Sequence, residues 1–275
     1  MNKFIIFTNT EKDEGLALSK KITEYLSEKG AESSIVCDAV LDNGTMDGFV
    51  KEADAAIVLG GDGTMLRATR GIGIYDIPLI GINLGTLGFL TEVEESNVFE
   101  ALDMLLKDRY IIENRMMIEG AVGNKTFHSL NDIVITRAGF SRVIGLNVFV
   151  NGQLLDTYEA DGVIVSTPTG STGYNLSAGG PIVSPKARVI VVTPISPHSL
   201  TSKSVVFDST DEIKIEIVKK RKTQDTEAIV SFDGGNSIDL GAGDVVSACI
   251  SSRTMRLIKV HDVNFYSVLR DKIGG

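Results

Sequence analysis

The segment Gly60-Gly61-Asp62-Gly63-Thr64 places a carboxylate among three glycines, directly after an apolar run. Such a turn leaves backbone N–H groups bare, and at the start of a helix these groups and the helix dipole favour phosphate. A carboxylate beside phosphates is repulsive unless a divalent cation intervenes or the carboxylate accepts a proton from a nucleophile. Both situations belong to phosphoryl transfer to a hydroxyl. Asp is also a favoured helix N-cap, so this segment alone leaves catalysis and capping open.

A second unusual stretch begins at Asp161 and reads DGVIVSTPTGSTGYNLSAGGPIV. It contains seven Ser, Thr or Tyr hydroxyls, and its one charged side chain is that of Asp161. Neutral donors and acceptors on a backbone turned by Gly and Pro suit a ribose diol or a purine edge better than a bare phosphate. The alternative interpretation is an ordinary loop of a β-sandwich.

Two shorter features add polar and aromatic groups. Asn131 and Asp132 stand just before an apolar run and could hold vicinal hydroxyls or an adenine edge, although such pairs are commonly turn formers. Segment 85–89 follows another apolar run and could offer Phe89 as a stacking face, with core packing as the alternative.

The patterns around these motifs predict two domains. Apolar runs at 4–7, 34–37, 55–59 and 78–82 alternate with helix-like patterns at 11–29, at 64–70, where a helix starts, and at 97–107. From about residue 110, β-rich segments recur between turn signals, at 132–136, 146–150, 162–166, 189–193, 213–218 and 228–232. We predict a Rossmann-like parallel α/β domain over 1–110, completed by 252–275 with a final strand at 254–260. An all-β sandwich domain is predicted over 111–251, with a solvated loop at 219–226.

Composition narrows the function classes. The 275 residues carry a net charge of −9, which argues against a general nucleic-acid or anionic-membrane surface. The two cysteines are far apart in sequence, and no apolar run is long enough for a signal peptide or a membrane span, so we expect a cytoplasmic protein. The P-loop, the GxSxG elbow, the HExxH zinc motif and the GxGxxG fingerprint are all absent from the sequence.

Together the motifs resemble the NAD kinase family. The matching segments occur in the family's order and are GGDGTML at 60–66, INLGTLGFLTE at 82–92, LND at 130–132, the stretch at 161–183 and TPISPHSL at 193–200. GGDGT is shared with diacylglycerol kinases, sphingosine kinases and 6-phosphofructokinases, whereas the stretch from Asp161 is specific to the family.

The resemblance implies ATP-dependent phosphorylation of the adenosine-ribose 2′-hydroxyl of NAD, giving NADP, with Mg²⁺ or another divalent cation bridging the ATP oxygens. ATP and NAD would be the substrates, the chain would form homodimers or homotetramers, and the metal ligands stay unassigned. Two alternatives stay open: a lipid or sugar kinase that shares GGDGT but has a different acceptor pocket, and a dinucleotide sensor without catalysis.

The resemblance also implies roles for individual residues. Asp62 would be the general base, and Gly61 and Gly63 would leave room for phosphates. Asn131 and Asp132 would hold the ribose or nicotinamide end of NAD. The other implied contacts are Asp161 to the nicotinamide-side amide, Phe89 beside the adenine, Arg67 and Arg142 to phosphates, and Thr172, Gly173, Tyr174, Asn175, Leu176 and Ser177 around the adenine and ribose.

Overall fold

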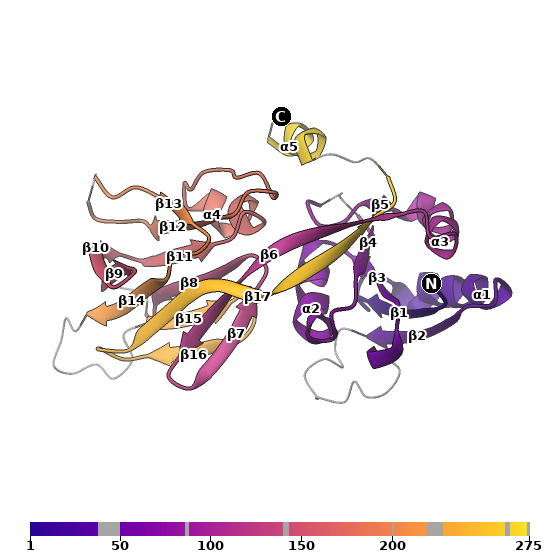
Figure 1. Cartoon of the computed structure of the whole chain (residues 1–275), viewed down its shortest axis with the longest axis horizontal. Helices are drawn as coiled ribbons and strands as arrows, with labels where there is room; N and C mark the ends of the chain where they lie inside the picture. The colour runs from indigo at the N-terminus through magenta and orange to yellow at the C-terminus, as the bar shows by residue number, and fades with distance from the viewer. Residues whose placement is uncertain are drawn as a thin grey trace. The chain divides into compact units, whose positions relative to one another are not determined.

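Four parallel strands form the centre of the N-terminal part of the chain (Figure 1). The structure, a computed structural model, describes residues 1–37, 50–85, 88–139, 143–199, 201–218, 228–261 and 265–273. The chain divides into two compact units: Met1–Asn114 with Met255–Gly275, called here the α/β unit, and Arg115–Thr254, called the β unit. The predicted solvated loop at 219–226 lies outside the described residues.

The sheet of the α/β unit has the strand order β2, β1, β3, β4, and each neighbouring pair is parallel. The predicted parallel α/β layer is therefore confirmed. The strands are β1 (Lys3–Thr8), β2 (Glu32–Cys37), β3 (Ala55–Gly60), β4 (Leu79–Asn83) and the short β5 (Val93–Glu94), which pairs with β4. The helices are α1 (Ala17–Glu28), α2 (Asp62–Ile72), α3 (Val98–Leu106) and α5 (Phe265–Ile273), with 3-10 helices at Glu14–Leu16, Val50–Glu52, Gly73–Tyr75 and Glu95–Asn97.

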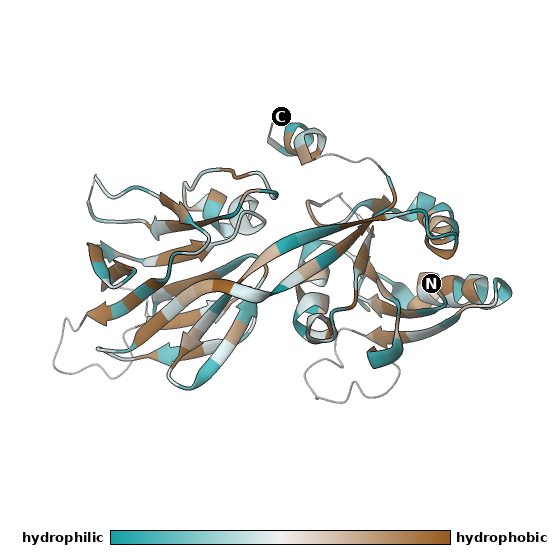
Figure 2. Cartoon of the chain, viewed as in Figure 1, coloured by the Kyte–Doolittle hydropathy of each residue, from teal (hydrophilic) through white to brown (hydrophobic). Residues whose placement is uncertain are grey.

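The inner strands of this sheet are covered on both faces. The residues of β3 and β4 are all buried, and Figure 2 shows these strands as mostly hydrophobic. Burial on both faces explains why each strand reads as an unbroken apolar run. Because the strands are parallel, the loops that follow β1, β3 and β4 leave the sheet at the same edge, which is where ligands bind in open α/β sheets.

The first helix begins later than the predicted range of 11–29. The Oδ1 atom of Asn9 accepts the backbone N–H of Lys12 at 3.2 Å, and Oδ1 of Asp13 accepts that of Leu18 at 2.9 Å. These side chains compete with helical hydrogen bonds and hold the chain in turns. The helix α1 therefore starts after this loop.

The β unit contains two packed antiparallel sheets, so the predicted sandwich is confirmed. One sheet has the order β13 (Val205–Asp208), β12 (Val189–Ile195), β11 (Gly162–Ser166), β8 (Asp132–Arg137), β15 (Ala228–Phe232) and β16 (Ser237–Leu240). The other contains β10 (Gln153–Ala160), β9 (Ile144–Val150), β14 (Ile213–Val218) and β17 (Val245–Lys259), with β6 (Ile111–Val122) paired to β17 and to β7 (Lys125–Ser129). A 3-10 helix, Gly170–Thr172, and the short α4 (Tyr174–Ser177) follow β11.

The core of the β unit lies between its two sheets. Strands β14 and β15 alternate buried and half-buried residues, as expected where one face packs on a core. Ile215 of β14 and Val165 of β11 belong to the same buried cluster. In the parts of the chain that the structure describes, no helix is long and apolar enough to cross a membrane.

The last strand is longer than the predicted 254–260. Strand β17 starts nine residues earlier, at Val245, and its first part pairs antiparallel with β14 in the β unit. Its residue Leu257 pairs parallel with Leu79 of β4 in the α/β unit. One strand thus carries residues of both units, and the polar residues 251–253 (SSR) separate its first part from the part that the sequence predicted.

Candidate functional site

The glycine turn after β3 positions the carboxylate of Asp62. Asp62 is the first residue of α2, and Gly61 occupies the N-cap position. The Asp62 carboxylate turns away from its own helix and accepts the backbone N–H groups of Phe89 at 2.8 Å and Leu90 at 3.0 Å. The alternative that Asp62 serves only as the helix N-cap is therefore wrong.

Gly88 allows this close approach between two segments that lie far apart in sequence. A Cβ atom added at residue 88 would lie 1.8 Å from Oδ1 of Asp62, well inside van der Waals contact. The backbone N–H of Gly88 is in turn held by Thr91 Oγ1 at 2.9 Å. The glycine in the segment after β4 therefore makes room for the Asp62 side chain.

The turn itself is open to a ligand. A Cβ atom at Gly63 would meet no atom within 4 Å among the described residues. A Cβ atom at Gly61 would meet one group, the ammonium of Lys12, at 3.6 Å. Two bare peptide units at the start of an eleven-residue helix and a lysine ammonium beside them together form a site for an anion.

Lys12 is a residue that sequence reasoning missed. Its ammonium also lies 4.0 Å from the position that a Cβ of Gly85 would take, so it stands near the loops after β3 and after β4. The backbone N–H of Asn9 donates to Leu59 O of β3 at 3.1 Å, which ties the loop of Lys12 to the end of that strand. The predicted helix at 11–29 would include Lys12. In the structure, Lys12 lies in the loop after β1, at the end of the sheet where the carboxyl ends of the parallel strands meet.

Three other residues were predicted to contact the phosphates or the adenine: Arg67, Phe89 and Arg142. Arg67 lies on α2, and its Nη2 atom donates to Thr64 Oγ1 at 3.3 Å. Phe89 packs against Phe265 of α5, with ring centroids 5.9 Å apart, and the ammonium of Lys272 lies 5.6 Å from its ring. Arg142 lies outside the described residues.

In the β unit, Asp132 is the first residue of β8 and Asn131 directly precedes it, and one carboxylate binds the backbone of both. The carboxylate of Asp233 accepts the N–H groups of Asn131 at 2.8 Å and Asp132 at 3.0 Å. The side-chain Oδ1 atom of Asn131 is buried and accepts no hydrogen bond from any residue that the structure describes. A buried acceptor without a donor is costly, and a hydroxyl or amide of a ligand would satisfy it.

The environment of Asp132 favours its protonated form. Asp132 is buried, with 6% of its surface exposed. Burial, and then the negative charge of Asp233, raise the pKa of the Asp132 carboxyl from 3.8 to about 7. A carboxyl group with such a pKa can both donate and accept a hydrogen bond near neutral pH.

This pKa gives a stability prediction for Asp132→Asn. Because the pKa is higher in the folded state, the folded state binds the proton more tightly, and the stabilisation by this proton is lost as the pH rises from about 4 to about 7. The variant has no such proton to lose. As the pH rises through this range, we expect the melting temperature of the wild type to fall relative to that of the variant, as measured by calorimetry at each pH. A difference between the two proteins that does not change with pH would contradict the pKa.

The loop after β11 packs directly on Asn131. Thr167 donates through its backbone N–H to Asn131 O at 2.9 Å, and a Cβ atom at Gly170 would lie 2.1 Å from that oxygen. A Cβ atom at Gly173 would lie 3.7 Å from Nδ2 of Asn131. The structure thus brings the LND segment together with the start of the hydroxyl-rich stretch.

Asn175 has a different position from its predicted neighbours in the stretch. It is fully buried, and its Nδ2 atom donates to Ser171 O at 3.1 Å and Pro181 O at 3.0 Å, while its Oδ1 atom accepts from Thr193 Oγ1 at 2.7 Å. These bonds hold the loop in shape. Thr172, Gly173 and Leu176 are half-buried, whereas Tyr174 and Ser177 are exposed.

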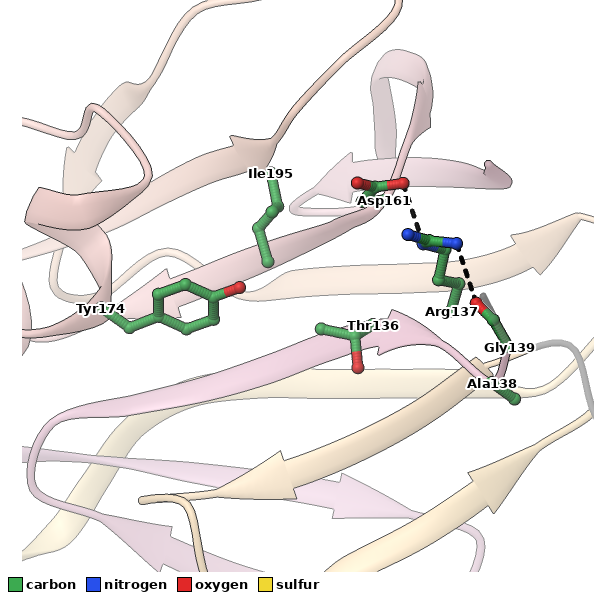
Figure 3. A pocket seen from close by; sticks show the side chains of 7 residues that line it. All are labelled: Thr136, Arg137, Ala138, Gly139, Asp161, Tyr174 and Ile195. Atoms are coloured by element: carbon green, nitrogen blue, oxygen red, sulfur yellow. Dashed lines mark hydrogen bonds and ion pairs between the residues drawn. The ribbon is translucent and has the colours of Figure 1, made fainter. Parts of the chain in front are cut away.

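Two predicted residues, Asp161 and Tyr174, line one cavity of about 420 Å³. Figure 3 shows the phenol ring of Tyr174 extending into the space beside Ile195. Arg137 pairs with Asp161, with Nε 2.9 Å from Oδ1, and also donates to Gly139 O at 2.9 Å. The cavity combines an aromatic face, an apolar wall and an ion pair at its rim, the composition expected of a site for a heterocyclic ligand. The other lining residues are Thr136 and Ala138.

The predicted site residues thus form one group in each unit. In the α/β unit, Gly61, Asp62 and Gly63 share the turn with Lys12. In the β unit, Asn131 contacts the loop that begins the hydroxyl-rich stretch, and Asp161 shares a cavity with Tyr174. Within the described ranges, no group of three or more His, Cys, Asp or Glu side chains is arranged to hold a metal ion.

Comparison with protein families gives two matches that follow each other along the chain. Residues 43–110 match the model of the ATP-NAD kinase N-terminal domain, and residues 130–260 match that of the ATP-NAD kinase C-terminal domain.

Two curated relatives match over the whole chain. An NAD kinase of Lachnoclostridium phytofermentans is 44% identical and aligns with 100% of this chain and 99% of its own length. An NAD kinase of Agathobacter rectalis is 44% identical with the same coverage.

Two solved structures share the fold. Yeast NADH kinase, solved with NADH, superposes with a TM-score of 0.83 over 100% of this chain and 88% of its own, at 23% identity. An NAD kinase from Archaeoglobus fulgidus, solved with ATP, gives a TM-score of 0.79 over 98% of this chain and 99% of its own, at 25% identity.

Proposed function

The chain belongs to the NAD kinase family, and we propose that it transfers the γ-phosphoryl group of ATP to the 2′-hydroxyl of the adenosine ribose of NAD, giving NADP. In this reaction the ribose oxygen forms a bond to the γ-phosphorus, the bond from that phosphorus to the bridging oxygen breaks, and ADP leaves. The hydroxyl proton goes to a base. The lipid or sugar kinase and the sensor without catalysis gain no support from the relatives.

The position of Asp62 is the observation that carries the proposal. A carboxylate offers about four lone pairs, and two of them are occupied by the N–H groups of Phe89 and Leu90. The remaining lone pairs can accept the proton of the attacking hydroxyl, while the two bonds keep the carboxylate from rotating. A base that is held in place beside an anion site is what transfer to an alcohol requires.

The donor phosphates are assigned to the glycine turn. We propose that the bare peptide units of Gly61 and Gly63 and the ammonium of Lys12 bind the triphosphate, with Arg67 as a further cation on the same helix. Mg²⁺ commonly keeps several waters and binds through substrate phosphates and one or two carboxylates. Asp62 is the carboxylate of this turn that could join such a shell, and the ion would supply neutralisation of the phosphate charge.

The acceptor NAD is assigned to the β unit. The buried Oδ1 atom of Asn131 lacks a donor in the described part of the chain, and the neighbouring Asp132 carboxyl can donate or accept, so the pair suits a ribose diol. The cavity lined by Asp161 and Tyr174 suits a planar amide-bearing ring such as nicotinamide, so Tyr174 is assigned to this ring and no longer to the adenine. Thr172, Gly173, Leu176 and Ser177 stay proposed contacts to the adenine and ribose.

Location and assembly are also proposals. Both cysteines, Cys37 and Cys249, are free, which supports a reducing compartment such as the cytoplasm. The resemblance to the family supports a homodimer or homotetramer, and no nucleic-acid or membrane partner is proposed.

Incubation of the purified protein with ATP, MgCl₂ and NAD tests the function. NADP is expected to accumulate with ATP consumption in a one-to-one ratio, as measured by a coupled assay with an NADP-specific dehydrogenase. Reactions without ATP or without NAD serve as controls, and reactions with a glycerolipid or a hexose as acceptor test the alternatives. No NADP under these conditions, or faster ATP turnover with a lipid or sugar, would overturn the proposal.

A further inference from the structure

One aspartate of the β unit binds three consecutive backbone N–H groups of the LND segment. The carboxylate of Asp233 accepts the N–H of Leu130 at 2.7 Å in addition to those of Asn131 and Asp132. The backbone N–H of Asp233 donates back to Asp132 O at 3.0 Å. Asp233 is only 7% exposed, so these bonds are shielded from water. Successive N–H groups that converge on one anion form a rigid arrangement, here with the anion supplied by the protein.

The turn that carries Asp233 is shaped to present its carboxylate. Asp233 and Gly234 have φ angles of +49° and +63°, a left-handed conformation that Asp tolerates better than most residues and that Gly adopts freely. The N–H of Gly235 closes the turn on Phe232 O at 2.9 Å. This conformation between β15 and β16 is kept although it is unfavourable for a residue with a side chain, which is common where a local geometry serves a site.

The carbonyl oxygens of the same segment are also occupied. Leu130 O accepts a hydrogen bond from the hydroxyl of Thr167, with Oγ1 at 2.6 Å, and Asn131 O accepts one from the backbone N–H of Thr167. With the bonds to Asp233, every backbone N–H and C=O of residues 130–132 has a partner within the protein. The side chains of Asn131 and Asp132 are therefore the groups that this segment offers to a ligand.

We propose that Asp233 is a positioning residue for NAD, because it fixes the backbone from which Asn131 and Asp132 reach the ribose. The inference rests on the proposed function. Asp233 itself points at backbone N–H groups and has no role in the chemistry. Asp233 is therefore expected to affect the binding of NAD and not that of ATP, since the ATP phosphates are assigned to the α/β unit.

The test is Asp233→Asn in the full-length protein. The variant has nearly the same shape, but its NH₂ group faces N–H donors and its charge is lost, so the LND backbone loses at least one charge-assisted bond. We expect the KM for NAD to rise about tenfold, which corresponds to one such bond, with the KM for ATP changed less than about twofold. Binding of NAD alone, measured by calorimetry below the melting temperature, should weaken by the same factor.

A matched control separates positioning from loss of stability. Asp54 likewise accepts two backbone N–H groups, from Asn2 at 2.6 Å and Lys3 at 3.0 Å, but it lies in the α/β unit. Asp54→Asn should lower the melting temperature and leave both KM values unchanged. If Asp233→Asn does not fold, Gly234→Ala offers a milder change, because alanine is disfavoured at its φ of +63° while the carboxylate stays. It should raise the KM for NAD by a smaller factor.

A double-mutant cycle with Asn131→Ala decides whether Asp233 acts through its neighbour. If it does, Asp233→Asn weakens NAD binding about tenfold in the wild type but clearly less in the Asn131→Ala background. Equal effects in both backgrounds, or an equal rise in the KM for ATP, would overturn the proposal while the wild type still makes NADP. A wild type that makes no NADP would instead refute the proposed function.

Discussion

Asp62→Asn is expected to lower kcat for NADP formation by about 10² to 10⁴-fold, the usual contribution of a general base. Asn has nearly the same size and can still accept a hydrogen bond from Phe89 N–H or from Leu90 N–H through its amide oxygen, so one of the two bonds that hold the side chain is kept. What it cannot do is take the hydroxyl proton. The dissociation constant for NAD, measured by calorimetry, should therefore change by less than about threefold.

The variant Gly88→Ala tests the position of the carboxylate instead of its charge. The added methyl would lie 1.8 Å from Oδ1 of Asp62, so the side chain must move even though the carboxylate is retained. A displacement of about 1 Å can cost about 10²-fold in rate, and we expect kcat to fall by that order. If Asp62→Asn turns over like the wild type, Asp62 serves only to anchor the segment at 88–90, and the base assignment fails.

The fold and the donor turn were largely predictable because their signals are local. The alternation of apolar runs and helix-like patterns gave the parallel sheet, and the contiguous Gly60–Gly63 segment marked the turn after β3. The predicted helix at 11–29 was too long because Asn9 and Asp13 bind backbone N–H groups, and sequence periodicity does not report such competition. Strand β17 was underestimated because the polar residues 251–253 (SSR) in its middle separate two parts that each contain apolar residues.

The parts of the site that the sequence did not predict depend on contacts between residues that are distant in sequence. Asp233 and Asn131 are 102 positions apart, and nothing near Asp233 indicates its partner; the Asp-Gly-Gly sequence around it predicts only a turn. Lys12 becomes relevant once the strand order β2, β1, β3, β4 is known, because that order brings the loops after β1 and β3 next to each other. Asn175 shows the converse, since its amide lies inside a segment identified as binding but is used entirely by the protein.

Arg137 is a further residue that a motif search passes over. It ends strand β8, and its guanidinium pairs with the carboxylate of Asp161 at 2.9 Å. Strands β8 and β11 are antiparallel neighbours, so the start of β11 and the end of β8 meet at the same edge. The sequence spacing of 24 positions between the two residues gives no sign of this pairing, which requires the sheet register.

Lys12→Met is expected to raise the KM for ATP by about ten- to a hundredfold, since a charge-assisted bond to phosphate is worth about 1.5–3 kcal/mol and 1.4 kcal/mol is tenfold. The chain carries a net charge of −9, so a triphosphate approaches against an unfavourable overall field and depends on local cations. The Lys12 ammonium lies 3.6 Å from the Cβ position of Gly61, beside the open turn. Initial rates at varied ATP and saturating NAD measure the effect, and the KM for NAD should stay the same.

The same lysine should recognise phosphates regardless of the adenosine attached to them. Inorganic tripolyphosphate is therefore expected to compete with ATP, and Lys12→Met should weaken this inhibition by the same factor as it raises the KM for ATP. Lys12→Arg keeps the charge and should retain most of the affinity, whereas Lys20→Met removes an exposed lysine of α1 that bonds to Gly15 O and should have no effect. If the Lys12→Met and Lys20→Met variants have equal KM values for ATP, the Lys12 ammonium does not bind the triphosphate, and the open turn must hold it through the backbone of Gly61 and Gly63, with Arg67 and the divalent cation.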